Sequence, residues 1–131
     1  MRTIEVACLV HVENGQLLLI ESKKNPGIYY MPGGKIEPGE TAEQALVREL
    51  QEELNITIDP ATIRHFGDFR AQAVNQPDGV DVHNHCFFAS FTGTPQPAAE
   101  IATIQLFTKA AYLAAPRQAP AVLKILDALA I

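Results

Sequence analysis

Residues 33–56 read GGKIEPGETAEQALVRELQEELNI, a glycine-rich turn that runs directly into a segment of helical periodicity. Thr41 is a favourable N-cap, because Gln44 stands at the third helical position and completes a capping box before the apolar residues. We therefore expect a helix over residues 42–54. Asn55, which tolerates the left-handed conformation, stands where a glycine usually ends a helix.

Three carboxylates occupy one face of this expected helix: Glu49, Glu52 and Glu53. Their i, i+3, i+4 spacing places all three within one turn, and the last two lie where the helix dipole is negative. The opposite face carries an apolar stripe of Ala42, Ala45, Leu46, Leu50 and Leu54. A divalent cation would relieve the repulsion, and hard oxygen ligands favour Mg2+ or Mn2+ over zinc. A solvated acidic face is the alternative interpretation of the same spacing.

The turn before the helix favours a bound ligand. Its prolines and glycines crowd into eight positions, and they are Pro32, Gly33, Gly34, Pro38 and Gly39. Such a density is typical of tight turns and of close approach between the backbone and a ligand. A main-chain carbonyl from this turn can face the carboxylate helix, which indicates a metal and phosphate site.

The whole stretch resembles the Nudix box, in which a Gly, a Glu six positions later, and Arg-Glu-apolar-x-Glu-Glu-x-Gly-apolar recur at fixed spacing. The matching positions are Gly34, Glu40, Arg48, Glu49, Leu50, Glu52, Glu53 and Ile56. The box spans residues 34–56, and Asn55 replaces its last Gly. Because Asn is the next most tolerant residue at positive φ, we expect the turn to survive. The segments PGGKIE, GET and RELQEE are similar to the corresponding segments of the MutT branch, whose members hydrolyse nucleoside triphosphates.

Composition predicts a single domain over residues 1–131. The chain is 47% apolar and 19% charged, with a formal net charge of −5, and this charge argues against a nucleic-acid duplex or an anionic membrane as partner. The first dozen residues include Glu5 and His11 and show neither a signal peptide nor a membrane span. We expect a cytoplasmic protein, monomeric or homodimeric, in which Cys8 and Cys86 are small buried hydrophobes kept reduced.

Apolar periodicity and turn residues predict the other elements. The expected strands are 3–12, 17–21, 63–74 with an interruption at Gly67, 82–92 and 104–107. The expected helices are 109–114 and 118–131, the latter with an apolar stripe of Val122, Leu123, Leu126 and Leu129. Asn14-Gly15 marks a hairpin between the first two strands. These elements imply an α+β fold, an α/β/α sandwich with a mixed, partly curled β-sheet, and the resemblance implies that it is the Nudix fold.

The resemblance also implies the site. It assigns a metal cluster to Glu49, Glu52, Glu53 and the main-chain carbonyl of Gly33, with Mg2+ or Mn2+ as the ion. Bound metal would spread the phosphate charge and activate a water molecule. The general base is Glu52 or Glu49, with Glu100 beyond the sheet as a rival, and the sequence does not choose among them.

Supporting and substrate-binding roles are expected around this cluster. Arg48 either orients a carboxylate for catalysis or forms an ordinary surface pair, and Glu40 is expected to accept backbone N–H bonds and hold the turn. The residues expected to meet substrate are Lys23, Lys35, His85 and Gln118. A solvated loop is the alternative for Lys23. His83 and His85 share one strand face, either as a metal pair that lacks a third ligand or with one of them lining the substrate cleft.

The implied function is Mg2+-dependent hydrolysis of a small nucleotide substrate with a diphosphate link, most simply a nucleoside triphosphate giving a monophosphate and pyrophosphate. A non-catalytic nucleotide-sensing domain and a Nudix hydrolase of another nucleotide-diphosphate derivative are the alternatives. The Pro of ADP-ribose hydrolases would fall near residues 71–72 and the Tyr of the diadenosine polyphosphate branch near Ala73, and this chain has neither. MutT-like enzymes recognise the oxidised purine base with an Asn in the C-terminal segment. The corresponding segment of this chain has Arg117 and Gln118 instead.

Overall fold

The computed structural model describes residues 2–73, 76–77 and 79–131, so the end of the expected strand 63–74 and part of the loop expected at 75–80 lie outside the described residues. The strands are β1 (Arg2–Leu9), β2 (Val12–Glu13), β3 (Gln16–Ser22), β4 (Gly33–Lys35), β5 (Thr57–Ile58), β6 (Arg64–Gln72), β7 (Val80–Phe88), β8 (Phe91–Thr92) and β9 (Ile101–Phe107). The helices are α1 (Ala42–Leu54), α2 (Lys109–Ala114) and α3 (Pro120–Leu129), together with the 3-10 turn η1 (Pro60–Thr62). None of the helices in the described part of the chain has the length and apolar character needed to cross a membrane.

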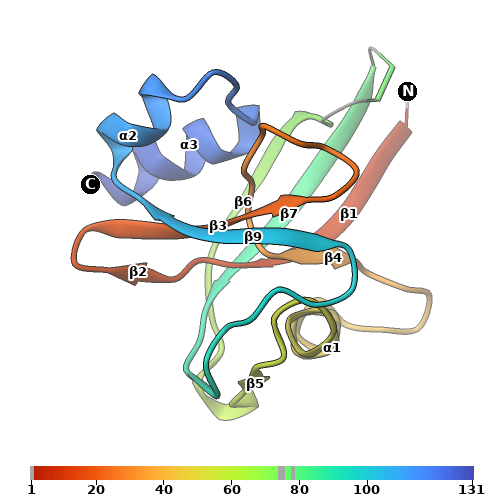
Figure 1. Ribbon diagram of the computed structural model, residues 1–131. Helices are drawn as coiled ribbons and strands as arrows, with labels where there is room; N and C mark the ends of the chain where they lie inside the picture. The colour runs from red at the N-terminus through yellow and green to blue at the C-terminus, as the bar shows by residue number, and fades with distance from the viewer. Residues whose placement is uncertain (1, 74–75, 78) are drawn as a thin grey trace.

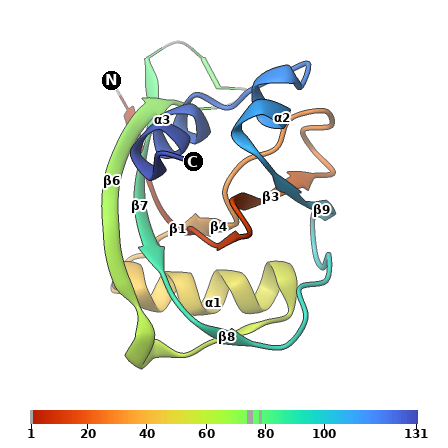
Figure 2. The same cartoon turned by 90° about the vertical axis from the view of Figure 1, so that its left-hand side faces the viewer.

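A mixed sheet forms the centre of the fold. Its four strands lie in the order β4-β1-β7-β6, and β1 runs parallel to β7 while the other neighbouring pairs are antiparallel. A three-stranded antiparallel sheet has the order β2-β3-β9, and β5 pairs with β8. Helix α1 covers one side of the sheets, and α2 and α3 cover the other (Figure 1, Figure 2). This arrangement confirms the expected α+β sandwich with a mixed sheet.

Successive residues of β1 pack on opposite sides of the sheet. Ala7 and Leu9 belong to a buried cluster that includes Leu46 of α1. Cys8 belongs to a second buried cluster that includes Val122 of α3. Because helices cover both sides, the second half of the strand, residues 6–9, is apolar at every position rather than alternating.

The ends of α1 follow from its sequence. The Thr41 hydroxyl accepts the Gln44 amide at 3.1 Å, and the Gln44 side-chain oxygen accepts the Thr41 amide at 2.9 Å. Asn55 has φ 56° and ψ 38°, and its amide donates to the Gln51 carbonyl at 3.1 Å. The buried residues are Ala45, Leu46, Leu50 and Leu54. The predicted helix over 42–54 and the surviving left-handed turn at its end are both confirmed.

Two local irregularities are also confirmed. Asn14 and Gly15 have φ of 51° and 75°, as a tight hairpin turn requires, and they join β2 to β3. The expected interruption at Gly67 is a register shift between His65 and Gly67, where β6 pairs with β7.

Element ends are where the sequence prediction is wrong. The expected strand 3–12 ends at Leu9, because the chain leaves the central sheet before it enters β2. The expected strand 82–92 breaks after Phe88, because the chain leaves the central sheet there before it enters β8. The last helix begins at Pro120 rather than residue 118, since proline fits the first helical turn. Its buried residues are Ala121, Val122, Ile125 and Leu126, whereas Leu123 and Leu129 are only partly buried.

The left-handed turn at Asn55 gives a stability prediction. We expect Asn55→Ala to lower the free energy of unfolding by about 1 kcal/mol. Both residues carry a Cβ that disfavours positive φ, but only asparagine offsets this with local hydrogen bonds, such as the one that its Oδ1 accepts from Gln51 at 3.0 Å. Asn55→Gly should stay within roughly 0.5 kcal/mol of the wild-type protein. Urea unfolding of the three proteins measures the difference, and equal stability of the Ala and Gly variants would contradict it.

Candidate active site

Gly33 brings the backbone of β4 against α1. Its φ is +145°, and its amide donates to Oε1 of Glu53 at 2.9 Å. A Cβ at this position would lie 2.0 Å from the carbonyl oxygen of Ala7 on β1. No larger residue fits here unless the strand moves, so the packing of β4 on β1 requires glycine.

Gly34 leaves room for a second carboxylate. A Cβ at Gly34 would lie 2.3 Å from the carboxyl carbon of Glu49. The Glu49 side chain is 16% exposed and lies directly against the backbone of this turn. The close approach indicated by the glycine density is therefore an approach between the turn and the carboxylates of α1.

Arg48 ties the turn to the carboxylate face of α1. Its Nε and Nη2 donate to the two carboxylate oxygens of Glu40 at 2.8 and 2.9 Å, and Nη2 also donates to the Lys35 carbonyl at 3.0 Å. Nη1 donates to Glu49 at 2.8 Å and lies 3.5 Å from Glu52. The contact with Arg48 lowers the pKa of Glu40 to about 2. Arg48 therefore has the geometry of a residue that orients carboxylates.

Glu53 is the carboxylate whose charge is least compensated. Burial, together with the negative charges of Glu49 and Glu52, raises its pKa to about 8, even though the hydrogen bond from the Gly33 amide acts to lower it. The guanidinium of Arg48, on the same helix, is hydrogen-bonded to Glu40 and Glu49. A cation beside Glu53 would supply the missing positive charge.

The donor set of this cluster fits a hard divalent cation, because it consists of three carboxylates beside a turn that offers main-chain carbonyl oxygen. The three glutamates of α1 have not converged, however. In the described part of the chain, the group of three or more histidine, cysteine, aspartate or glutamate residues whose ligand atoms all lie within 4.8 Å of one another consists of Glu5, His83 and His85. Side-chain rotation is needed for the glutamates to meet one ion, and Glu52 is 55% exposed and free to rotate.

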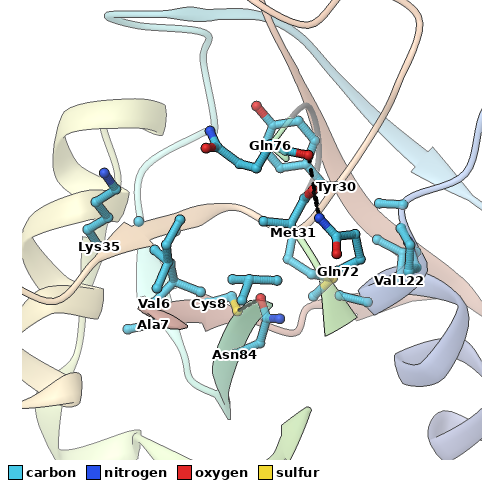
Figure 3. Close-up of a pocket in the computed structure, with 18 of the residues that line it drawn as sticks. Val6, Ala7, Cys8, Tyr30, Met31, Lys35, Gln72, Gln76, Asn84 and Val122 are labelled. Carbon is cyan, nitrogen blue, oxygen red and sulfur yellow. Dashed lines mark hydrogen bonds between the residues drawn. The ribbon is translucent and has the colours of Figure 1, made fainter. Parts of the chain in front are cut away.

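A pocket of about 280 Å³ lies on the other side of the central sheet. It is bounded by β1, β4, β6 and β7 and by the start of α3 (Figure 3). Gly33, Gly34 and Lys35 of β4 line it, so the same strand forms the wall of the pocket and the contact with α1. Most of the other lining side chains are apolar, such as Val6, Met31, Val82 and Val122.

Two polar side chains of the pocket come from β6 and β7. Asn84 is buried; its amide donates to the Phe69 carbonyl at 3.2 Å, and its oxygen accepts from the Cys8 thiol at 3.4 Å. Gln72 donates to the Pro77 carbonyl at 2.9 Å. An asparagine amide has two N–H groups and an oxygen with two lone pairs, so Asn84 keeps capacity for a ligand.

The candidate residues from the sequence lie in different places. Lys35 lines the pocket. The Lys23 ammonium donates to the Ala99 carbonyl at 3.3 Å, in the loop before β9. Gln118 donates to the Leu113 carbonyl at 3.3 Å, where it closes the end of α2. His85 lies on the opposite face of β7 from Asn84, within 2.8 Å of Glu5.

Glu100 lies in a loop that is attached to the end of α1. The Ala98 amide donates to the main-chain carbonyl of Glu53 at 2.9 Å. The Glu100 carboxylate forms an exposed ion pair with Lys24 at 2.9 Å. The loop thus runs beside the helix that carries the acids, while the Glu100 side chain points to a lysine.

Sequence reasoning missed Asn84 and Gln72 as pocket residues. A signal for Asn84 was available, because it is the polar member of a strand face whose neighbours are Val82 and Cys86. For Gln72 no local signal exists, because its place in the pocket depends on the pairing of β6 with β7.

Comparisons with known proteins show the family of this chain. A family model described as NUDIX domain matches residues 1–129. The chain is 36% identical over 100 residues to the CTP pyrophosphohydrolase of Escherichia coli K12, a match that covers 73% of this chain and 70% of that protein. It is 37% identical over 82 residues to the 8-oxo-dGTP diphosphatase of the same organism, covering 60% of each. A match to a putative 8-oxo-dGTP diphosphatase of Bacillus subtilis covers 48% of that protein.

Solved structures give the same result. The solution structure of the E. coli ORF135 protein has a TM-score of 0.74 and 31% identity, covering 99% of this chain and 90% of that one. The MutT NUDIX hydrolase of Burkholderia pseudomallei has a TM-score of 0.79 at 23% identity, covering 98% and 99%, which shows a shared fold. The expected family resemblance is confirmed, and MutT-like proteins are among the relatives: this chain belongs to the Nudix hydrolase family.

Proposed function

We propose that this chain is a Mg2+-dependent pyrophosphohydrolase that converts a nucleoside triphosphate to the monophosphate and pyrophosphate. The observation that carries the proposal is the position of β4, since Gly33 and Gly34 contact the acids of α1 and also line the pocket. A nucleotide with its base in the pocket would have its phosphates at this edge of the sheet. Relatives named CTP pyrophosphohydrolase and 8-oxo-dGTP diphosphatase support a nucleotide substrate. We place the reaction in the cytoplasm, where nucleoside triphosphates and Mg2+ occur together.

In this proposal the Gly33 carbonyl, Glu49, Glu52 and Glu53 hold the metal. When bound, Mg2+ neutralises phosphate oxygens and makes a water molecule more acidic. Glu49 is fixed by Arg48 at 2.8 Å and Glu53 by the Gly33 amide at 2.9 Å, so both carboxylates are oriented before the ion binds.

Glu52 is the general base in this proposal. It is 55% exposed, and its closest contact with Arg48 is 3.5 Å, so it is the least constrained of the three acids. Its carboxylate would accept the proton of the attacking water. The water oxygen forms a bond to phosphorus, the proton moves to Glu52, and the bond to the leaving pyrophosphate breaks.

One prediction concerns the carboxylates of α1. Glu53→Gln should abolish Mg2+-dependent release of pyrophosphate while the protein stays folded, because the amide replaces an anion that the cation needs. Glu52→Gln should lower kcat roughly 10²- to 10⁴-fold, as loss of a general base does. The measurement is pyrophosphate release from a panel of nucleoside triphosphates, with Mg2+ and with EDTA.

Two further variants control this experiment. Glu43→Gln changes an exposed acid in the first turn of the same helix and should keep wild-type activity. Glu100→Gln tests the rival base. Full activity of the Glu53→Gln variant, or a larger loss for Glu100→Gln than for Glu52→Gln, would contradict the assignments.

The raised pKa of Glu53 predicts a pH dependence of stability. The ordinary value is 4.5 and the folded value is about 8. The folded state therefore holds a proton that the unfolded state has released, and the free energy of unfolding of the metal-free protein should fall as pH rises from about 4.5 to about 8. Mg2+ should stabilise the protein more at the upper end of this range, because it binds the ionised acid.

Glu53→Gln supplies the comparison for this pH effect. The variant should lose the part of the pH dependence that falls in this window, and Mg2+ should stabilise it less than it stabilises the wild-type protein. Urea unfolding with EDTA and with Mg2+, at intervals from about pH 5 to about pH 9, measures both effects. Parallel curves for the two proteins would contradict the role given to Glu53.

The pocket gives the prediction on substrate choice. We expect Asn84 to hydrogen-bond an edge of the base, since its side chain lines the pocket and is fixed by the Phe69 carbonyl and the Cys8 thiol. Asn84→Ala should raise KM for the preferred nucleotide about tenfold and change kcat less, because loss of one such bond is worth ~1.4 kcal/mol. Gln105→Ala, at an exposed position of β9, is the control. A KM that stays at the wild-type value for every nucleotide would contradict this role of the pocket.

A further inference from the structure

A second group of side chains with metal-binding chemistry lies outside the Nudix box. Parallel pairing of β1 with β7 places Glu5 beside His83, and antiparallel pairing of β6 with β7 places Asp68 opposite His85. The three strands are neighbours in the central sheet (Figure 1). Glu5, His83 and His85 lie on the face of the sheet opposite the pocket, because the pocket is lined by Val82 and Asn84.

The two histidines converge on one carboxylate. Oε1 of Glu5 lies 3.0 Å from Nδ1 of His83 and 2.8 Å from Nε2 of His85. One ligand atom from each of the three residues lies within 4.8 Å of the other two. The imidazole rings are 4.2 Å apart between centroids and tilted by 34°, so their nitrogens point to a common edge.

Asp68 lies behind the two rings. Its carboxylate is 3.3 Å from Nδ1 of His85 and 3.8 Å from Nε2 of His83, which are the nitrogens that do not face Glu5. Histidines that bind metal usually donate their other ring N–H to a carboxylate, which fixes the tautomer and the ring orientation. Asp68 lies on the side of each ring where such a carboxylate stands, within ion-pair distance, and its own hydrogen bond is with His65 at 2.8 Å.

Both carboxylates are held in the ionised form. The hydrogen bond with His85 lowers the pKa of Glu5, and the hydrogen bond with His65 lowers the pKa of Asp68. The side chains are 16% exposed at His83, 23% at His85 and 45% at Glu5, so solvent reaches the edge that the rings share. Water can therefore complete the coordination of an ion bound there.

We propose that Glu5, His83 and His85 bind a transition-metal ion of the Zn2+ class at a site separate from the carboxylates of α1. Two imidazole nitrogens and one carboxylate oxygen form a donor set that Zn2+ accepts, with water in the fourth position. Mg2+ prefers all-oxygen ligands, so the two sites differ in the metal that they select. The ion joins β1 to β7 through side chains from both strands.

The test is calorimetric titration of the full chain with Zn2+ in the presence of excess Mg2+, which occupies oxygen-only sites. The wild-type protein should bind one equivalent. Glu5→Gln and His83→Ala should each weaken binding at least about tenfold, and Asp68→Asn should weaken it by about ten- to a hundredfold. His11→Ala changes a histidine elsewhere in the chain and should keep the wild-type affinity.

Co2+ provides a readout in the wild-type protein that needs no variant. Coordination by two imidazoles and a carboxylate should give visible absorbance bands that Zn2+ abolishes by displacement, and His83→Ala should not show them. Absence of saturable Zn2+ binding in the wild-type protein, or equal affinity in the Glu5→Gln, His83→Ala and wild-type proteins, would overturn the proposal. The cluster would then be a network of hydrogen-bonded ion pairs without a metal.

Discussion

The contact between Gly33 and Glu53 is the constraint on which the site depends. The amide of β4 reaches the carboxylate at 2.9 Å, and a Cβ on Gly33 would meet the Ala7 carbonyl oxygen at 2.0 Å. Gly33 is also in register with Cys8 of β1, so β4 cannot move away from α1 without disturbing the central sheet. Strand pairing and the geometry of the carboxylates are therefore fixed together.

The central sheet separates two chemical environments. On one side, Asn84 and apolar residues of β1 and α3 form a pocket suited to an aromatic base. On the other side, α1 presents its acids beside β4, and the histidines of β7 face Glu5. Because side chains alternate along a strand, a shift of β7 by one residue would exchange Asn84 with His85 and destroy both environments.

Local sequence signals predicted the features of α1 that depend on residues close together in the chain. The capping box at Thr41, the left-handed Asn55 and the acid spacing on α1 required only neighbours within one turn, and the family motif added the turn before the helix. The pocket and the Glu5–His83 contact required the parallel pairing of β1 with β7, between residues separated by most of the chain. Neither strand carries a local sequence signal for that pairing. The sequence therefore showed no sign that Glu5 would be the third ligand beside His83 and His85.

Arg48 has a consequence for the dynamics of binding. Its forked contacts with Glu40, and its bond to the Lys35 carbonyl, connect the segment between β4 and α1 to the helix through the protein's own groups. The conformational entropy of this segment is consequently lost when the protein folds and not when a nucleotide arrives. This backbone is preorganised, and a preorganised segment loses less conformational entropy when a ligand binds.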